Sequence, residues 1–169
     1  GVVVSVVNGL AALLGSSQRV APVAAAPTAP VATPAAPPAA QVLTNEVDAA
    51  VARPVDPAMF TGEILNIGMV SGTKPATLGM AVRKHGRTTA YTEGTITLLN
   101  ATVNVAYGSR TARFTGQIIT GPMSQGGDSG SLIVDGTSNQ AVGLLFAGSN
   151  LSTIINPIDR VLAALNITI

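Results

Sequence analysis

Hydrophobic and polar positions alternate in short runs over most of the chain. Six stretches are rich in β-branched or apolar residues and are bounded by Gly, Asn, Ser or Pro: 76–84, 93–108, 112–120, 130–136, 140–148 and 152–158. Their spacing is typical of an all-β barrel or sandwich. Near the C-terminus Pro157 suits the first turn of a helix. Four apolar residues then share one face of that helix: Ile158, Val161, Leu162 and Leu165. The pattern predicts a β-barrel closed by one C-terminal helix.

The first 41 residues have a different pattern. Residues 1–14 are apolar at near-helical spacing, which predicts a short helical segment. Residues 15–41 are rich in Pro and Ala, and proline fixes φ and removes backbone donors, so we expect a linker or surface loop. The apolar run at the start is shorter than the roughly 20 residues of a membrane-spanning helix, so we expect no membrane span. Because the chain begins with Gly rather than Met, we expect a processed or trimmed piece of a longer protein.

Composition and charge narrow the classes of function. The 169 residues are 47% hydrophobic and 10% charged, which suits one compact unit. A net charge of +1 offers no electrostatic basis for binding nucleic acid. The chain has no cysteine and a single histidine, His85, so neither a thiolate metal site nor a multi-histidine metal centre is available, and we predict no cofactor.

The stretch SQGGDSGSLIV, residues 124–134, carries the candidate chemistry. Gly126, Gly127 and Gly130 allow a sharp turn and leave backbone amides uncovered by side chains. In such a turn the amides of Gly127 and Ser129 can form an oxyanion hole, with Ser129 as the attacking hydroxyl. An ordinary β-turn explains the same residues equally well.

The motif GDSGS resembles the nucleophile loop of chymotrypsin-fold serine proteases. Upstream, KHGRTTAYTEGTITLLNATVN is similar to a stretch of the bacterial streptogrisin and α-lytic type. A bacterial branch with plant narrow-leaf relatives looks closer still, since VDAAVARP, GPMS, GDSGS, VGLLFAGS and INPI follow in the same order. The resemblance covers residues 42–169. It implies a chymotrypsin-like double β-barrel, of which this chain holds the end of the first barrel, the whole second barrel and the C-terminal helix.

The resemblance also implies roles for individual residues. Ser129 matches the nucleophile, and the amides of Gly127 and Ser129 match the oxyanion hole. Asp48 takes the place of the acid that orients the catalytic histidine, on a strand of the first barrel; without the resemblance it would be a turn or edge residue. Asp128 is expected to pair with a basic residue, because an isolated buried carboxylate is very unfavourable. Lys84 matches that partner, with Arg83 and Arg87 as alternates.

Substrate recognition is predicted from the same resemblance. The family's substrate pocket is lined by the segment before the nucleophile and by the strand after it. Here these positions hold no carboxylate, which favours an apolar or small side chain of a peptide or protein substrate: Met123, Ser124, Phe146, Ala147 and Gly148.

The chain departs from the family pattern at one catalytic group. The family order is His, Asp, Ser, and no histidine precedes Asp48. We expect an N-terminal fragment of the same precursor, separated by autoproteolysis or truncation, to supply it. His85 is an alternative base, because the order Asp, His, Ser occurs in an unrelated protease fold. A second alternative is a catalytically inactive protease-like module that binds peptides by strand pairing or has a structural role.

Overall fold

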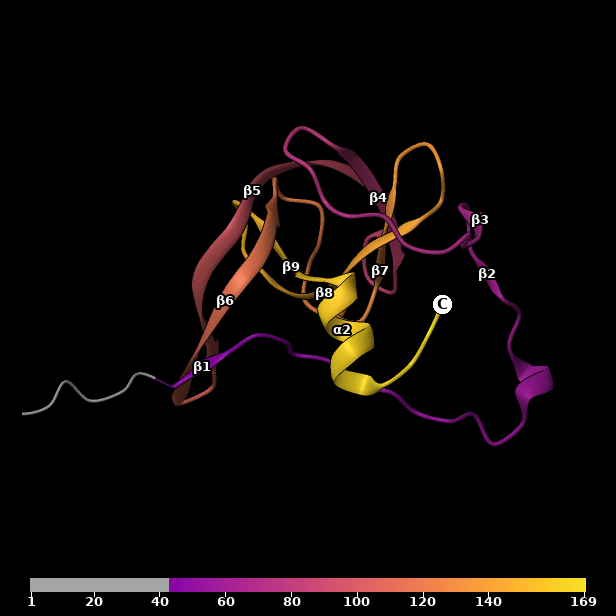
Figure 1. Ribbon diagram of the computed structural model, residues 1–169, viewed down its shortest axis with the longest axis horizontal. Helices are drawn as coiled ribbons and strands as arrows, with labels where there is room; N and C mark the ends of the chain where they lie inside the picture. The colour runs from indigo at the N-terminus through magenta and orange to yellow at the C-terminus, as the bar shows by residue number, and fades with distance from the viewer. Residues whose placement is uncertain (1–42) are drawn as a thin grey trace, which may run out of the picture. The chain divides into compact units, whose positions relative to one another are not determined.

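The computed structural model describes residues 43–169 (Figure 1). The predicted helical segment 1–14 and linker 15–41 lie outside the described residues. The first elements of the described part are very short: β1 (Thr44–Asn45), the 3-10 helix η1 (Pro57–Met59), β2 (Glu63–Ile64) and β3 (Gly68–Met69). None of these was predicted, because two or three residues are too few to show a period.

The main body is a closed antiparallel barrel of six strands. They are β4 (Ala81–Gly86), β5 (Ala90–Tyr107), β6 (Arg110–Thr120), β7 (Leu132–Asp135), β8 (Ala141–Gly148) and β9 (Thr153–Pro157). Neighbours follow the order β6-β5-β4-β7-β8-β9, and β9 pairs back with β6, so the sheet closes on itself. Each strand overlaps one of the six predicted stretches, although β4 begins five residues later than predicted and ends two residues later. The predicted barrel is therefore confirmed.

Alternation along each strand separates the barrel interior from its surface. On β4, Val82, Lys84 and Gly86 are buried, whereas Arg83 and His85 lie on the other face. The interior is mostly apolar, and its buried polar side chains include Lys84, Asp128 and Asn156. Complete burial of an aliphatic side chain contributes about 1.5–3 kcal/mol to the free energy of unfolding. The main cluster consists of Val82, Ile96, Ile118, Met123, Ile133, Val142, Leu145 and Ile155.

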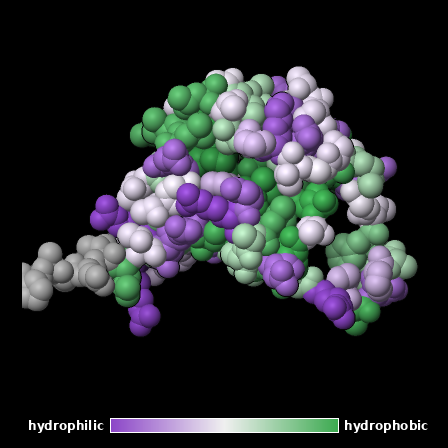
Figure 2. Space-filling view, in the orientation of Figure 1, coloured by the Kyte–Doolittle hydropathy of each residue, from purple (hydrophilic) through white to green (hydrophobic). Residues whose placement is uncertain are grey.

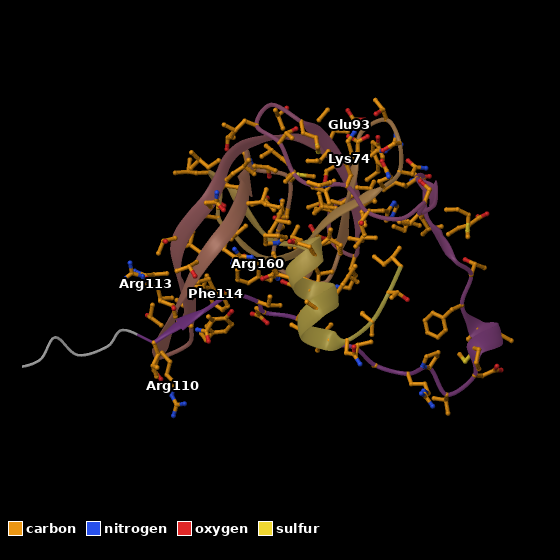
Figure 3. The ribbon with its side chains drawn as sticks, in the orientation of Figure 1. Lys74, Glu93, Arg110, Arg113, Phe114 and Arg160 are labelled. Atoms are coloured by element: carbon orange, nitrogen blue, oxygen red, sulfur yellow. The ribbon has the colours of Figure 1, made fainter. Side chains whose placement is uncertain are left out.

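The hairpin of β5 and β6 extends beyond the part of β5 that pairs with β4. Register shifts bend β5 between Ile96 and Val103. Figure 3 shows Arg110 at the hairpin end, with Arg113 and Phe114 further along β6. The parallel strand β1 pairs with β6 at these last two positions, Arg113 and Phe114. This pairing brings the chain alongside the barrel just before Asp48.

Asp48 itself belongs to no strand. The sequence interpretation had placed it on a strand of the first barrel. That detail is wrong in the described part, because β1 ends at Asn45 and pairs with β6 of the closed barrel. Side chains rather than a strand ladder hold Asp48 in place, as shown below.

The helix α2 (Ile158–Leu165) packs on β8 and β9 (Figure 1). Its buried residues, Ile158 and Val161, belong to the predicted apolar face. Asn166 ends the helix in the left-handed conformation, with φ of 51°. Among residues 43–169, no helix combines the length and the apolar character of a membrane span.

Candidate active site

The loop between β6 and β7 is built around a buried carboxylate. Asp128 is 1% exposed. Its Oδ1 accepts hydrogen bonds from the amides of Thr88 at 2.7 Å and Thr89 at 3.1 Å. Its Oδ2 accepts from the Thr89 hydroxyl at 2.6 Å and the Gln125 amide at 3.0 Å, and lies 3.3 Å from Lys84 Nζ. One side chain therefore ties the loop to the turn between β4 and β5.

These contacts determine the charge state of the carboxyl group. Burial alone raises the pKa of Asp128, but the Thr89 hydroxyl and the surrounding amides outweigh it, so the pKa lies well below its ordinary value. Lys84 is fully buried, and its Nζ also donates to the Thr89 hydroxyl and to Ala90 O. The alternate Arg83 instead donates to Asn139. Lys84 is thus the cation that the structure brings to Asp128.

The backbone amides of the loop have two kinds of environment. The amides of Asp128, Gly130 and Ser131 donate to carbonyl groups at 2.7–3.0 Å. In the described part of the chain, the amides of Gly127 and Ser129 have no acceptor. Gly127 has a φ of 101°, which a residue with a side chain rarely adopts. The amide of Gly126 likewise has no acceptor among the described residues, so the loop leaves the donors on either side of Asp128 open to a ligand.

Ser129 is exposed at the rim of a cleft of about 690 Å³. Its hydroxyl donates to Phe146 O at 3.2 Å. The cleft lies between the β5–β6 hairpin and the end of β8. None of the described residues that line it carries a charge: Val105, Ala106, Tyr107, Ser124, Gln125, Gly126, Ser129, Leu145, Phe146, Ala147, Gly148, Ser149 and Asn150.

Four of the five residues predicted for the pocket line this cleft: Ser124, Phe146, Ala147 and Gly148. Met123 does not, because it is 4% exposed and belongs to the barrel core. Its sulfur lies so close to Gly94 that a Cβ there would be 2.7 Å away. The side chain of Met123 therefore packs in the barrel core and does not line the cleft.

Asp48 is half-buried beside the cleft and does not line it. Its Oδ2 accepts a hydrogen bond from the Tyr107 hydroxyl, and Tyr107 lines the cleft together with Ser129. The Asn156 side chain binds the Asp48 backbone. The sequence interpretation missed Tyr107 and Asn156. No local signal could have revealed them, because they lie 59 and 108 residues from Asp48.

His85 lies on the β4 face opposite to Lys84. Its Nδ1 is 3.4 Å from Asn66 Nδ2. Within the described part, the only side-chain hydrogen bond of Ser129 goes to Phe146 O. The structure therefore does not bring His85 to the Ser129 hydroxyl.

Comparisons with known proteins bear on the fold that carries this site. No protein-family profile matches the sequence. Protease A of Thermobifida fusca has 31% identity and a TM-score of 0.53, over 63% of this chain and 59% of its own. The Nocardiopsis protease has 28% identity and a TM-score of 0.51, over 62% of this chain and 56% of its own. The chain thus spans less than two thirds of the solved structures it matches. The predicted resemblance to bacterial chymotrypsin-fold serine proteases of the streptogrisin and α-lytic type is confirmed, and so is the predicted all-β fold class with one C-terminal helix.

Proposed function

We propose that this chain, which has the fold of the bacterial chymotrypsin-like serine proteases, is the C-terminal portion of a serine endopeptidase. The observation that carries the proposal is the loop of residues 126–131. It presents the exposed hydroxyl of Ser129 on a turn anchored by the buried Asp128, and among residues 43–169 the amides of Gly127 and Ser129 have no acceptor. A flexible surface loop would not need so many hydrogen bonds on one carboxylate.

In this proposal Ser129 Oγ attacks the carbonyl carbon of a peptide bond bound in the cleft. A histidine accepts the hydroxyl proton and later donates it to the leaving amine. The amides of Gly127 and Ser129 bind the oxyanion of the tetrahedral intermediate. Water then hydrolyses the acyl-enzyme. Asp48 orients the histidine and stabilises its charged form.

The histidine comes from an N-terminal part of the same precursor, which binds this chain as a partner. Two observations support this step. The chain spans 56–59% of the proteases it matches at TM-scores above 0.5. In addition, the segment after Asp48 exposes apolar side chains that a partner would cover: Val51, Val55, Met59, Phe60, Leu65 and Met69. Figure 2 shows hydrophobic side chains on the surface of the described part as well.

The residue before the scissile bond is apolar or small in this proposal. The cleft walls support it, because Ser124, Phe146, Ala147 and Gly148 offer no carboxylate to bind a lysine or an arginine.

The decisive experiment is labelling with a fluorophosphonate probe, which reacts with activated serines. It compares wild type with Ser129→Ala, both for this chain alone and for the longer precursor. The matched control is Ser149→Ala, which removes another serine hydroxyl from the cleft. We expect the precursor to be labelled in wild type and in the control, but not in Ser129→Ala.

Two other results would contradict parts of the proposal. A precursor that stays unlabelled would argue for an inactive module that binds peptides. Labelling of this chain alone at Ser129 would place the base within the chain, and His85→Ala would then test the alternative base.

A further inference from the structure

The backbone of Asp48 is held by one buried side chain. Asn156, which is fully buried on β9, accepts a hydrogen bond from Asp48 N at 3.0 Å and donates one to Asp48 O at 2.8 Å. The same amide donates to Leu144 O on β8 at 3.3 Å. The side chain thus takes the place of a strand neighbour for a residue that has none.

A second buried amide holds the chain two residues earlier. Gln117 on β6 is fully buried, and its Nε2 donates to Glu46 O at 2.9 Å. Gln117 and Asn156 lie next to the paired residues Ile118 and Ile155, which join β6 to β9. Both amides therefore come from the strand pair that closes the barrel, so the segment 46–48 is fixed to these two strands.

The carboxylate of Asp48 has a separate partner. The Tyr107 hydroxyl donates to Oδ2, and among residues 43–169 no donor reaches Oδ1. Tyr107 packs on Phe114 with ring centroids 6.4 Å apart, and Phe114 packs on Phe146 at 4.9 Å. These tilted aromatic contacts connect the hairpin end with the wall of the cleft. Burial and the bond to Asp48 raise the pKa of Tyr107, so the phenol stays protonated as a donor.

We propose that Asn156 and Tyr107 are positioning residues for Asp48: Asn156 fixes its backbone, and Tyr107 holds Oδ2 so that Oδ1 faces the N–H group of the catalytic imidazole. The inference rests on the proposed function. It assigns to Asp48 an orientation that the closed barrel provides by itself, before any N-terminal part is bound. The acid of the triad is thus preorganised, and the histidine only has to dock against it.

The first test uses this chain alone and needs no activity. The chain has two tyrosines, so Tyr91→Phe leaves Tyr107 as the only phenol. We expect its ultraviolet titration to lie above the ordinary tyrosine pKa of about 10, and to move down when Asp48→Asn is added. We also expect the amide of Asp48 to be protected from hydrogen exchange, and Asn156→Ala to abolish that protection. An unchanged titration or an already unprotected amide would overturn the proposal.

The second test uses the precursor and a peptide substrate. Tyr107→Phe keeps the aromatic ring and removes one hydrogen bond to a charged group, so we expect kcat to fall about tenfold with KM unchanged. Without the Tyr107 hydrogen bond, the Asp48 carboxylate should stabilise the imidazolium more strongly. This raises the pKa of the catalytic histidine and moves the acid limb of the kcat/KM profile to higher pH. Tyr91→Phe is the matched control, because its hydroxyl bonds Glu93 on the same strand.

The outcomes separate the two proposals. If wild-type precursor neither cleaves peptides nor reacts with the fluorophosphonate, the proposed function fails, while the titration and exchange data still decide whether the contacts to Asp48 exist. If the precursor is active and Tyr107→Phe leaves kcat and the pH profile unchanged, the positioning role fails alone. An increase in kcat would overturn it too, because Tyr107 would then compete with the imidazole for Asp48.

Discussion

Removal of the buried cation beneath the nucleophile loop should destabilise the protein strongly. In Lys84→Met most of the aliphatic stem is kept, but the ammonium group is lost together with its hydrogen bonds to Thr89 and Ala90, which leaves Asp128 buried without its counter-ion. Breaking a buried pair costs about 3–5 kcal/mol. The lower end applies here, because Asp128 keeps its bonds from the Thr88 amide and from the amide and hydroxyl of Thr89. We therefore expect a loss of about 3 kcal/mol.

Urea unfolding followed by circular dichroism measures this loss, since the chain has no tryptophan for fluorescence. With a slope of about 2 kcal/mol per molar urea, the midpoint should fall by about 1.5 M. Lys74→Met is the matched control: Lys74 Nζ lies 3.1 Å from Asp135 Oδ1, but its side chain is 39% exposed. Asp135 is buried, but water reaches Lys74 and the carboxylate keeps its hydrogen bonds from Thr137 and Ser138, so we expect a loss of about 0–1 kcal/mol, as for a surface pair. Equal losses in the two variants would refute the reasoning, which attributes the effect to burial and not to pairing as such.

The pH dependence of stability tests the same carboxylate. Because the folded-state pKa of Asp128 is lowered, its contribution is present above the unfolded-state value of about 3.9 and is lost as the pH falls below it. The urea midpoint of wild type should therefore drop between about pH 5 and pH 2. Asp128→Asn should start from a lower midpoint and lose less over that range. An equal acid slope in both proteins would contradict the assignment.

Two further predictions concern packing and specificity. Gly143→Ala should lower the free energy of unfolding by about 1–3 kcal/mol, because a Cβ would collide with Ile155 Cγ2 and lie 2.6 Å from Asn156 O. The control Gly121→Ala, where a Cβ meets no heavy atom within 4 Å, should change the free energy of unfolding by less than about 0.5 kcal/mol. Similar urea midpoints for the two variants would argue against the close contact of β8 and β9. In a panel of chromogenic peptides, the active precursor should cleave after apolar or small residues faster than after Lys or Arg, and a preference for Arg would contradict the uncharged cleft.

Much of the barrel could be predicted from the sequence, because the signals involved are local. Alternating apolar residues and turn residues predicted all six barrel strands, and the apolar face after Pro157 predicted α2. The glycines around Asp128 likewise predicted a turn with uncovered amides. Such features depend on the backbone preferences of single residues and on the period of side chains along one strand. Both can be recognised from residues that are close together in the sequence.

Pairings between distant residues were decided by the tertiary structure. A resemblance to a family suggested Lys84 for Asp128, but only the register of β4 against the loop excludes Arg83, which lies on the other face of the strand. Asn156 reaches Asp48 from β9, which closes the barrel against β6, and Tyr107 reaches it from the end of β5, beside the β6 segment that pairs with β1. The sequence by itself determined the strands, the helix and the turn. Closure of the barrel decided which side chains meet, because contacts across a sheet depend on register and on the face that each residue occupies.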